Sequence, residues 1–145
     1  MAFRKTTQGR CHCGNLEILL ESGVALDDLQ LRACQCSFCV RHGARSTSDA
    51  QGKTTVICHD TSGLVRYQFG LKTCEFFLCG YCGVYVVAVL TEGEKSWSTI
   101  NVNTLVAPGR FNRPATPVSY DGETEAERIE RRKRHWTPTE LRLGA

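Results

Sequence analysis

Residues 79–83 read CGYCG, and this stretch determines the fold that the sequence predicts. Two cysteines separated by two residues and followed by glycine form the pattern of a zinc knuckle. The turn brings both sulfur atoms onto one ion, backbone N–H groups point at them, and the glycine supplies a backbone conformation that other residues avoid. A knuckle supplies half the ligands of a tetrahedral site, so a second pair of cysteines is needed to complete it.

Two further cysteine clusters precede this knuckle: a C-x-C pair followed by glycine, and a triplet within six residues. They are Cys11 and Cys13 in CHCG, and Cys34, Cys36 and Cys39 in ACQCSFCVRHGA (residues 33–44). If the first pair joins Cys79 and Cys82 on one ion, four thiolates close a structural site. The triplet then binds a second ion and leaves one position open, which is the pattern of a catalytic site. We therefore predict two zinc ions per chain.

Two other arrangements of the ligands fit the same sequence. Cys36 and Cys39 could join the knuckle in a single four-thiolate site, and the other clustered cysteines would then be small buried hydrophobic residues. Alternatively, His42 follows Cys39 by three residues and could close the triplet as a site of three sulfur atoms and one nitrogen. Cys58 and Cys74 lie inside strand-like runs, so we expect them to be core residues.

Short β-type segments rich in Val, Ile, Thr and aromatic residues dominate the chain, and turns rich in Gly, Asp and Ser separate them. The segments are residues 15–21, 29–33, 53–58, 64–69, 74–79, 83–90 and 96–102. This pattern predicts a mainly β fold of antiparallel sheets, with at most a short turn of helix after Cys39.

The last part of the chain has a different character. Residues 107–122 are rich in proline and predict an extended strap. Residues 124–136, TEAERIERRKRHW, predict a helix with a narrow apolar face, and Thr124 and Glu127 form its capping box. We therefore predict a zinc-binding domain over residues 1–112, followed by the strap and charged helix over residues 113–145.

Charge and cysteine usage narrow the possible partners and compartment. The net charge is +3, and glutamates nearly cancel the basic residues of the C-terminal helix, so we expect neither a nucleic acid nor a membrane partner. The opening MAFRKTTQGR has no apolar run, and the apolar stretch at residues 83–90 is too short to span a bilayer. Nine cysteines without an export signal indicate thiol or metal chemistry in a reducing cytoplasm.

Five motifs in order resemble the glutathione-dependent formaldehyde-activating enzyme family. They are GRCHCG (9–14), CQCSFC (34–39), YQFG (67–70), FLCGYCGVY (77–85) and INVNTL (100–105). The resemblance covers roughly Gly9 to Leu105 and implies an Mss4-like fold, a β-tent of antiparallel sheets stapled by zinc. It also implies a structural zinc on the first and third clusters and a catalytic zinc on the triplet.

The activity implied by this resemblance is that of a carbon–sulfur lyase, which adds glutathione to formaldehyde or reverses that addition. A zinc ion held by three thiolates is a good partner for a soft sulfur ligand, so we expect a small-molecule thiol, such as glutathione, as substrate. Arg41, His42 and Arg45 follow the triplet and could bind the carboxylates of glutathione, or could belong to a solvated loop. The alternatives to an enzyme are a non-catalytic two-zinc structural or binding module and a thiol-redox or metal-handling protein.

Overall fold

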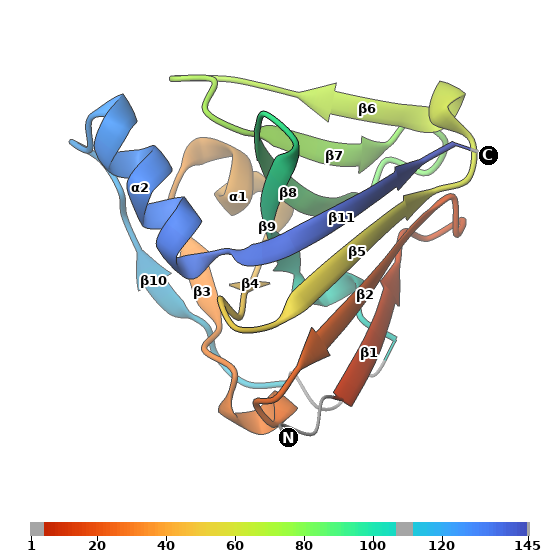
Figure 1. Cartoon of the computed structure of the whole chain (residues 1–145), viewed down its shortest axis with the longest axis horizontal. Coiled ribbons are helices and arrows are strands. Elements are labelled where there is room, and N and C mark those ends of the chain that lie inside the picture. Colours follow the sequence, from red (N-terminus) through yellow and green to blue (C-terminus); the bar gives the residue numbers. More distant parts are fainter. Residues whose placement is uncertain (1–4, 107–111, 145) are drawn as a thin grey trace.

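A computed structural model of the chain describes residues 5–106 and 112–144. Eleven strands form one sheet, in the order β1-β2-β5-β11-β9-β4-β3-β10, and β6, β7 and β8 join it through β9. Two α-helices accompany the sheet, and the second leads directly into the last strand (Figure 1). The predicted mainly β fold with a C-terminal helix is confirmed.

The elements have the following bounds. The strands are β1 (Lys5–Arg10), β2 (Leu16–Ser22), β3 (Arg32–Cys34), β4 (Ser46–Thr47), β5 (Lys53–Cys58), β6 (Leu64–Tyr67), β7 (Glu75–Cys79), β8 (Tyr85–Glu92), β9 (Lys95–Asn101), β10 (Thr116–Val118) and β11 (Thr137–Leu143). The α-helices are α1 (Ser37–His42) and α2 (Glu125–His135), and short 3-10 turns lie at Leu26–Asp28, Thr61–Gly63 and Val102–Thr104. No helix within residues 5–106 and 112–144 is long and apolar enough to cross a membrane.

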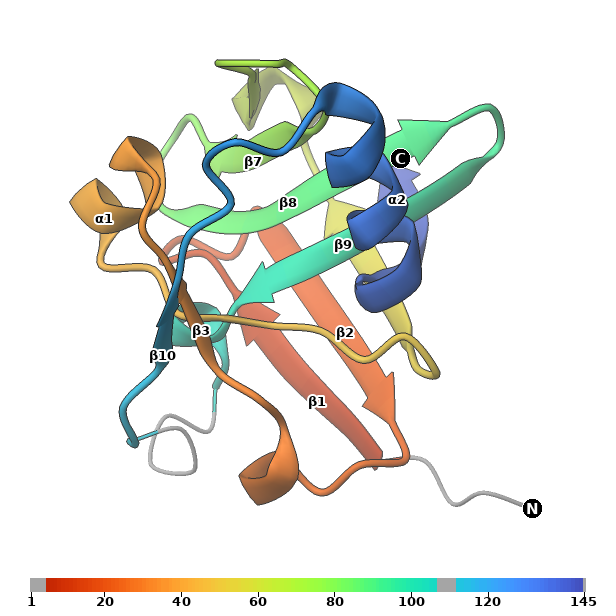
Figure 2. The same cartoon turned by 90° about the vertical axis from the view of Figure 1, so that its left-hand side faces the viewer.

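The sheet is mixed, which corrects the prediction of antiparallel sheets alone. The hairpins β1–β2, β6–β7, β7–β8 and β8–β9 are antiparallel, but β11 runs parallel to β5 and β10 runs parallel to β3. Both parallel pairs arise because the C-terminal segment returns to strands formed much earlier in the chain. In Figure 1, β11 crosses the molecule beside β5, and β10 lies beside β3, as the turned view in Figure 2 also shows. Of the predicted strap, residues 107–111 lie outside the described residues.

Strand β8 separates two hydrophobic clusters, and this division places the functional site. Val86, Val87 and Val89 belong to the larger cluster, which fills the space between β8 and the strands β2 and β5. Tyr85 and Ala88 belong to a smaller cluster on the other face, together with residues of α1 and Trp136. Because both faces of β8 are covered, its sequence is a continuous apolar run rather than an alternating one.

The two helices are held by local contacts that the sequence largely anticipates. Thr124 Oγ1 accepts a hydrogen bond from the Glu127 N–H at 3.1 Å, and Glu127 Oε1 accepts one from the Thr124 N–H at 3.0 Å, so the capping box of α2 is confirmed. Helix α1 begins two residues before Cys39, not after it as predicted. The reason is that Cys36 acts as its N-cap, since the Cys36 sulfur accepts a hydrogen bond from the Cys39 N–H at 3.4 Å.

Candidate metal centres and the adjoining cavity

The first and third cysteine clusters meet and form a group of four ligands. The sulfur atoms of Cys11, Cys13, Cys79 and Cys82 all lie within 4.8 Å of one another. The distance is 3.8 Å from Cys11 Sγ to Cys13 Sγ and 3.5 Å from Cys13 Sγ to Cys79 Sγ. A tetrahedral ion with metal–sulfur bonds of about 2.3 Å places its sulfur ligands about 3.8 Å apart, so this quartet fits a metal ion.

Two hairpin turns deliver the quartet. Cys11 and Cys13 lie in the turn between β1 and β2, whereas Cys79 ends β7 and Cys82 lies in the turn before β8. Each turn closes on a glycine with a left-handed backbone, and these are Gly14 (φ 87°) and Gly83 (φ 83°). A side chain would strain both positions, which explains why glycine follows the cysteines in both motifs.

The surroundings of the quartet act differently on its thiols, since burial raises the pKa of Cys79 whereas the pKa of Cys82 is lowered. The Leu16 N–H donates a hydrogen bond to Cys11 Sγ at 3.3 Å. Burial opposes ionisation of Cys82, but N–H donors of Cys13 and Val84 outweigh it and lower the pKa of this thiol to about 6. A group of thiols with backbone donors around it releases protons readily to a metal ion.

The middle cluster forms a second, separate group of three ligands. The sulfur atoms of Cys34, Cys36 and Cys39 lie within 4.8 Å of one another, at the end of β3 and the start of α1. Hydrogen bonds from Cys34 and Cys39 lower the pKa of Cys36 to about 2, while the same contacts and burial raise the pKa of Cys39. The donor set of the triplet, three sulfur atoms, fits a soft metal cation.

The grouping of the sulfur atoms can be compared with the two alternative arrangements, the single four-thiolate site and the triplet closed by His42. Cys36 and Cys39 group with Cys34 and not with the knuckle cysteines, so the single four-thiolate site is not the arrangement adopted. The His42 ring makes tilted contacts with Phe38, with ring centroids 4.5 Å apart, and with Tyr85 at 5.6 Å. His42 is not part of the ligand group found within the described residues.

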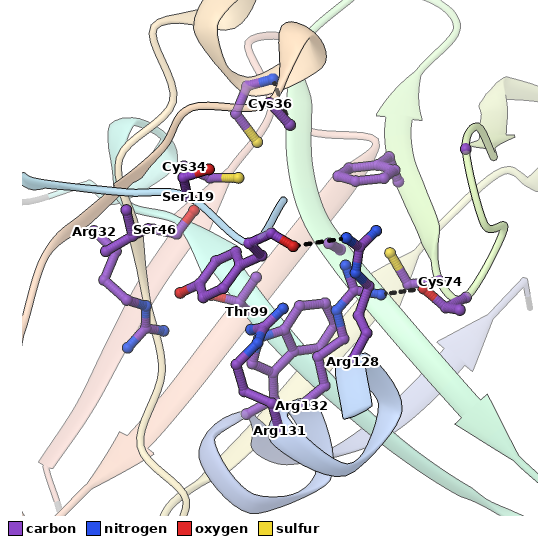
Figure 3. A pocket seen from close by; sticks show the side chains of 18 of the residues that line it. Arg32, Cys34, Cys36, Ser46, Cys74, Thr99, Ser119, Arg128, Arg131 and Arg132 are labelled. Carbon is purple, nitrogen blue, oxygen red and sulfur yellow. Dashed lines mark hydrogen bonds between the residues drawn. The ribbon is translucent and has the colours of Figure 1, made fainter. Parts of the chain in front are cut away.

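The triplet faces a cavity of about 290 Å³, whereas no residue of the quartet lines it. Its walls come from β3 and α1, from β8 and β9, from residues 118–121 and from α2. In Figure 3, Cys34 and Cys36 lie at one end of the cavity and arginine side chains extend from α2 toward the other. Among the described residues, four arginines line it: Arg32, Arg128, Arg131 and Arg132.

The arginines and aromatic residues of this cavity are the functional candidates that the sequence interpretation missed. Arg128, Arg131 and Arg132 are spaced at i, i+3 and i+4, so they share one face of α2, and this spacing was a signal available in the sequence. Tyr85 also lines the cavity, and burial raises the pKa of its hydroxyl well above the usual value. Cys74 lines the cavity as a buried thiol and Cys58 is buried in the larger cluster, as expected of core residues.

The three residues predicted to bind the substrate lie elsewhere, since none of them lines the cavity. Arg41 is exposed and donates a hydrogen bond back to the Ser37 carbonyl at 3.0 Å. Arg45 donates hydrogen bonds to Asn103 Oδ1 at 2.9 Å and to the Arg113 carbonyl at 3.2 Å. His42 lies in the aromatic contacts described above.

Comparison with known proteins supports the fold. The chain is similar to a Rhodobacter sphaeroides protein of known crystal structure, with a TM-score of 0.54 and 29% sequence identity. The match covers 76% of this chain and 97% of that one. No protein-family model and no curated protein matches the chain. The class defined by fold and site is therefore a mainly β protein with two cysteine groups that could each hold a metal ion.

Proposed function

We propose that this protein is a zinc-dependent enzyme of the carbon–sulfur lyase type that acts on a thiol adduct such as S-hydroxymethylglutathione. The observation that carries the proposal is the asymmetry of the two cysteine groups. The quartet has four ligands and lines no part of the cavity, whereas the triplet has three and opens onto it. Closed sites with four protein ligands are structural, and sites with three protein ligands beside a pocket are catalytic.

Zinc suits both donor sets, because borderline-soft cations prefer thiolate ligands in tetrahedral geometry. Held by Cys34, Cys36 and Cys39, zinc would lower the pKa of a substrate thiol and keep it as a nucleophilic thiolate near neutral pH. The quartet would hold the structural ion and join the two hairpin turns. The motifs that resemble the formaldehyde-activating family favour the same division.

The chain's own residues would position the adduct and its proton. In the lyase direction the hydroxyl proton of the adduct passes to water, the carbon–sulfur bond breaks, sulfur keeps the electron pair as a thiolate, and formaldehyde is released. Tyr85 lines the cavity with a hydroxyl that burial keeps protonated, so it is the neutral donor available to the oxygen atom of the adduct. Phe69 and Phe76 lie beside Tyr85 in the cavity wall and would limit the access of water.

Two other functions remain as alternatives, a non-catalytic two-zinc module and a thiol-redox protein. Neither needs a cavity lined by arginines beside the triplet, and for this reason we favour the enzyme. The proposal includes a reducing compartment such as the cytoplasm, where the nine cysteines would persist as thiols. It includes a small-molecule thiol as partner, and neither a nucleic acid nor a membrane.

Exchange spectroscopy by NMR tests this proposal. Formaldehyde and glutathione interconvert spontaneously with their adduct, and protein loaded with two zinc ions should accelerate the exchange. The Cys36→Ala variant should show only the spontaneous rate, and Arg134→Gln, at an exposed position of α2, should retain the wild-type rate. Exchange at the spontaneous rate with wild-type protein that carries both ions would reject the enzyme in favour of the two-zinc module.

A further inference from the structure

Arg132 is half-buried, and although Cys74 and Glu123 lie near enough to favour its charged form, no carboxylate within residues 5–106 and 112–144 pairs with it directly. Its Nη1 donates a hydrogen bond to Thr73 Oγ1 at 2.6 Å, and its guanidinium lies over the Trp136 ring, 4.7 Å from the centroid. Its Nε is buried and has no hydrogen-bond partner within residues 5–106 and 112–144. No carboxylate in those residues forms an ion pair with it.

Unlike Arg132, the neighbouring arginines Arg128 and Arg131 of α2 each form an ion pair with a carboxylate. Arg131 donates two hydrogen bonds to the Glu123 carboxylate, at 2.8 and 3.0 Å. Arg128 donates one to the same carboxylate at 3.4 Å and one to the Tyr120 carbonyl at 3.1 Å. A single carboxylate therefore pairs with two of the three arginines, and Arg132 is the one that has no ion pair within the part of the chain that the structure describes.

The rest of the cavity does not supply the missing anion. Arg32, on β3, is half-buried and donates a hydrogen bond to Ser48 Oγ at 2.6 Å. Asp121, the one acidic residue among the described lining residues, is exposed to solvent. A zinc ion bound by three thiolates would leave one negative charge at the sulfur end, fewer than the positive charges that line the cavity.

A guanidinium partly withdrawn from water without a paired carboxylate is costly, and a bound anion removes that cost. Burial lowers the pKa of Arg132, as expected of a cation withdrawn from water. The planar guanidinium is also suited to paired hydrogen bonds with a carboxylate. Figure 3 places Arg128 and Arg132 together, across the cavity from Cys34 and Cys36.

We propose that Arg132, with Arg128 beside it, binds a carboxylate of the substrate and selects thiols that carry an anionic group. This inference rests on the proposed function, because it requires the thiol to bind at the triplet. The substrate would then span the cavity, with its sulfur atom at the cysteines and its carboxylate at α2. Arg132 would be a specificity-determining residue, supplied by the segment that follows the last cysteine cluster.

Two matched thiols test the inference. 3-Mercaptopropionate carries a carboxylate, and 3-mercaptopropionamide has nearly the same shape without the charge. Their binding to cobalt-substituted protein can be followed through the sulfur-to-cobalt charge-transfer band. Wild-type protein should bind 3-mercaptopropionate at least about tenfold more tightly than 3-mercaptopropionamide. This difference is a typical contribution of a charge-assisted hydrogen bond.

The Arg132→Gln variant should lose this preference while its affinity for the amide and its metal content stay unchanged. Arg134→Gln, on the exposed face of the same helix, should keep the preference. If Arg132→Gln weakens the binding of both thiols equally, the role of Arg132 is purely structural and the inference is overturned. Equal affinity of wild-type protein for the two thiols would overturn it as well. If neither thiol binds to fully loaded wild-type protein, the proposed function fails, and the inference fails with it.

Discussion

Cys13 Sγ lies 3.5 Å from Cys79 Sγ, although 66 positions separate the two residues in the sequence. The first belongs to the turn between β1 and β2, and the second ends β7. An ion bound by the quartet would therefore fasten two hairpins that share no strand pairing with each other. The triplet differs, because its three cysteines lie within six consecutive residues.

Cys79→Ala should abolish cooperative folding. A structural zinc contributes on the order of 10 kcal/mol to folding, and a whole domain is stable by only about 5–15 kcal/mol. The variant should be insoluble or lack a cooperative thermal transition in circular dichroism. A variant with a wild-type melt would show that the quartet does not hold the fold together.

Cys36→Ala should keep the sheet and its cooperative melt, because the triplet connects only β3 with α1. It should lose one of two zinc ions and all thiol binding, as measured by metal analysis and the cobalt charge-transfer band. If this variant unfolds as completely as Cys79→Ala, the middle site is structural and the enzyme proposal loses its support.

Tyr85→Phe should slow the reaction while leaving the fold intact. Phenylalanine preserves the ring, including its edge contact with Phe38 at 5.1 Å between centroids, and removes only the hydroxyl. If Tyr85 acts as proposed, the loss of a donor to the developing oxygen charge should lower turnover by roughly 100- to 1000-fold, with little change in the affinity for a thiol. Tyr67→Phe is a matched control, since Tyr67 also stacks on Phe38 but does not line the cavity. Equal rates in the two variants would remove Tyr85 from the mechanism.

Glu123→Gln should make stability less dependent on pH in the acidic range. Hydrogen bonds from Arg131 depress the pKa of Glu123 in the folded protein. The stabilisation from this carboxylate is therefore present above the pKa of the unfolded state, about 4.3, and is lost as the pH falls through the lower folded value. The variant should be less stable than wild type by about 1 kcal/mol or less at pH 7. Thermal melts against pH should show the two curves converging in acid, and a constant difference would contradict the assignment.

The cysteine sites were predictable because their chemistry is local. A C-x-x-C or C-x-C pair followed by glycine defines its own turn, and Gly14 and Gly83 adopt the left-handed conformation that this requires. Each of the seven predicted β segments overlaps a strand. Strand β1, KTTQGR, was missed because its polar sequence carries no β signal, and it forms only by pairing with β2.

The spacing of Arg128, Arg131 and Arg132 predicts that they share one face of α2, but not that this face lines the cavity, because tertiary contacts orient the helix. β11 pairs with both β5 and β9, and this fixes Trp136 and turns one face of α2 toward the cavity. Proximity in sequence pointed instead to Arg41, two residues after Cys39. On a helix, two residues amount to a rotation of about 200°, so Arg41 faces away from the side occupied by Cys39.

The fourth ligand of the triplet ion is the most direct test of the proposed function. A crystal structure of the zinc-loaded protein with 3-mercaptopropionate, with anomalous scattering measured at the zinc edge, would identify it. We expect zinc on Cys34, Cys36 and Cys39, with the thiol sulfur as fourth ligand at about 2.3 Å. A His42 nitrogen in that position, at about 2.0–2.1 Å, would mean a closed structural site and would contradict the catalytic role.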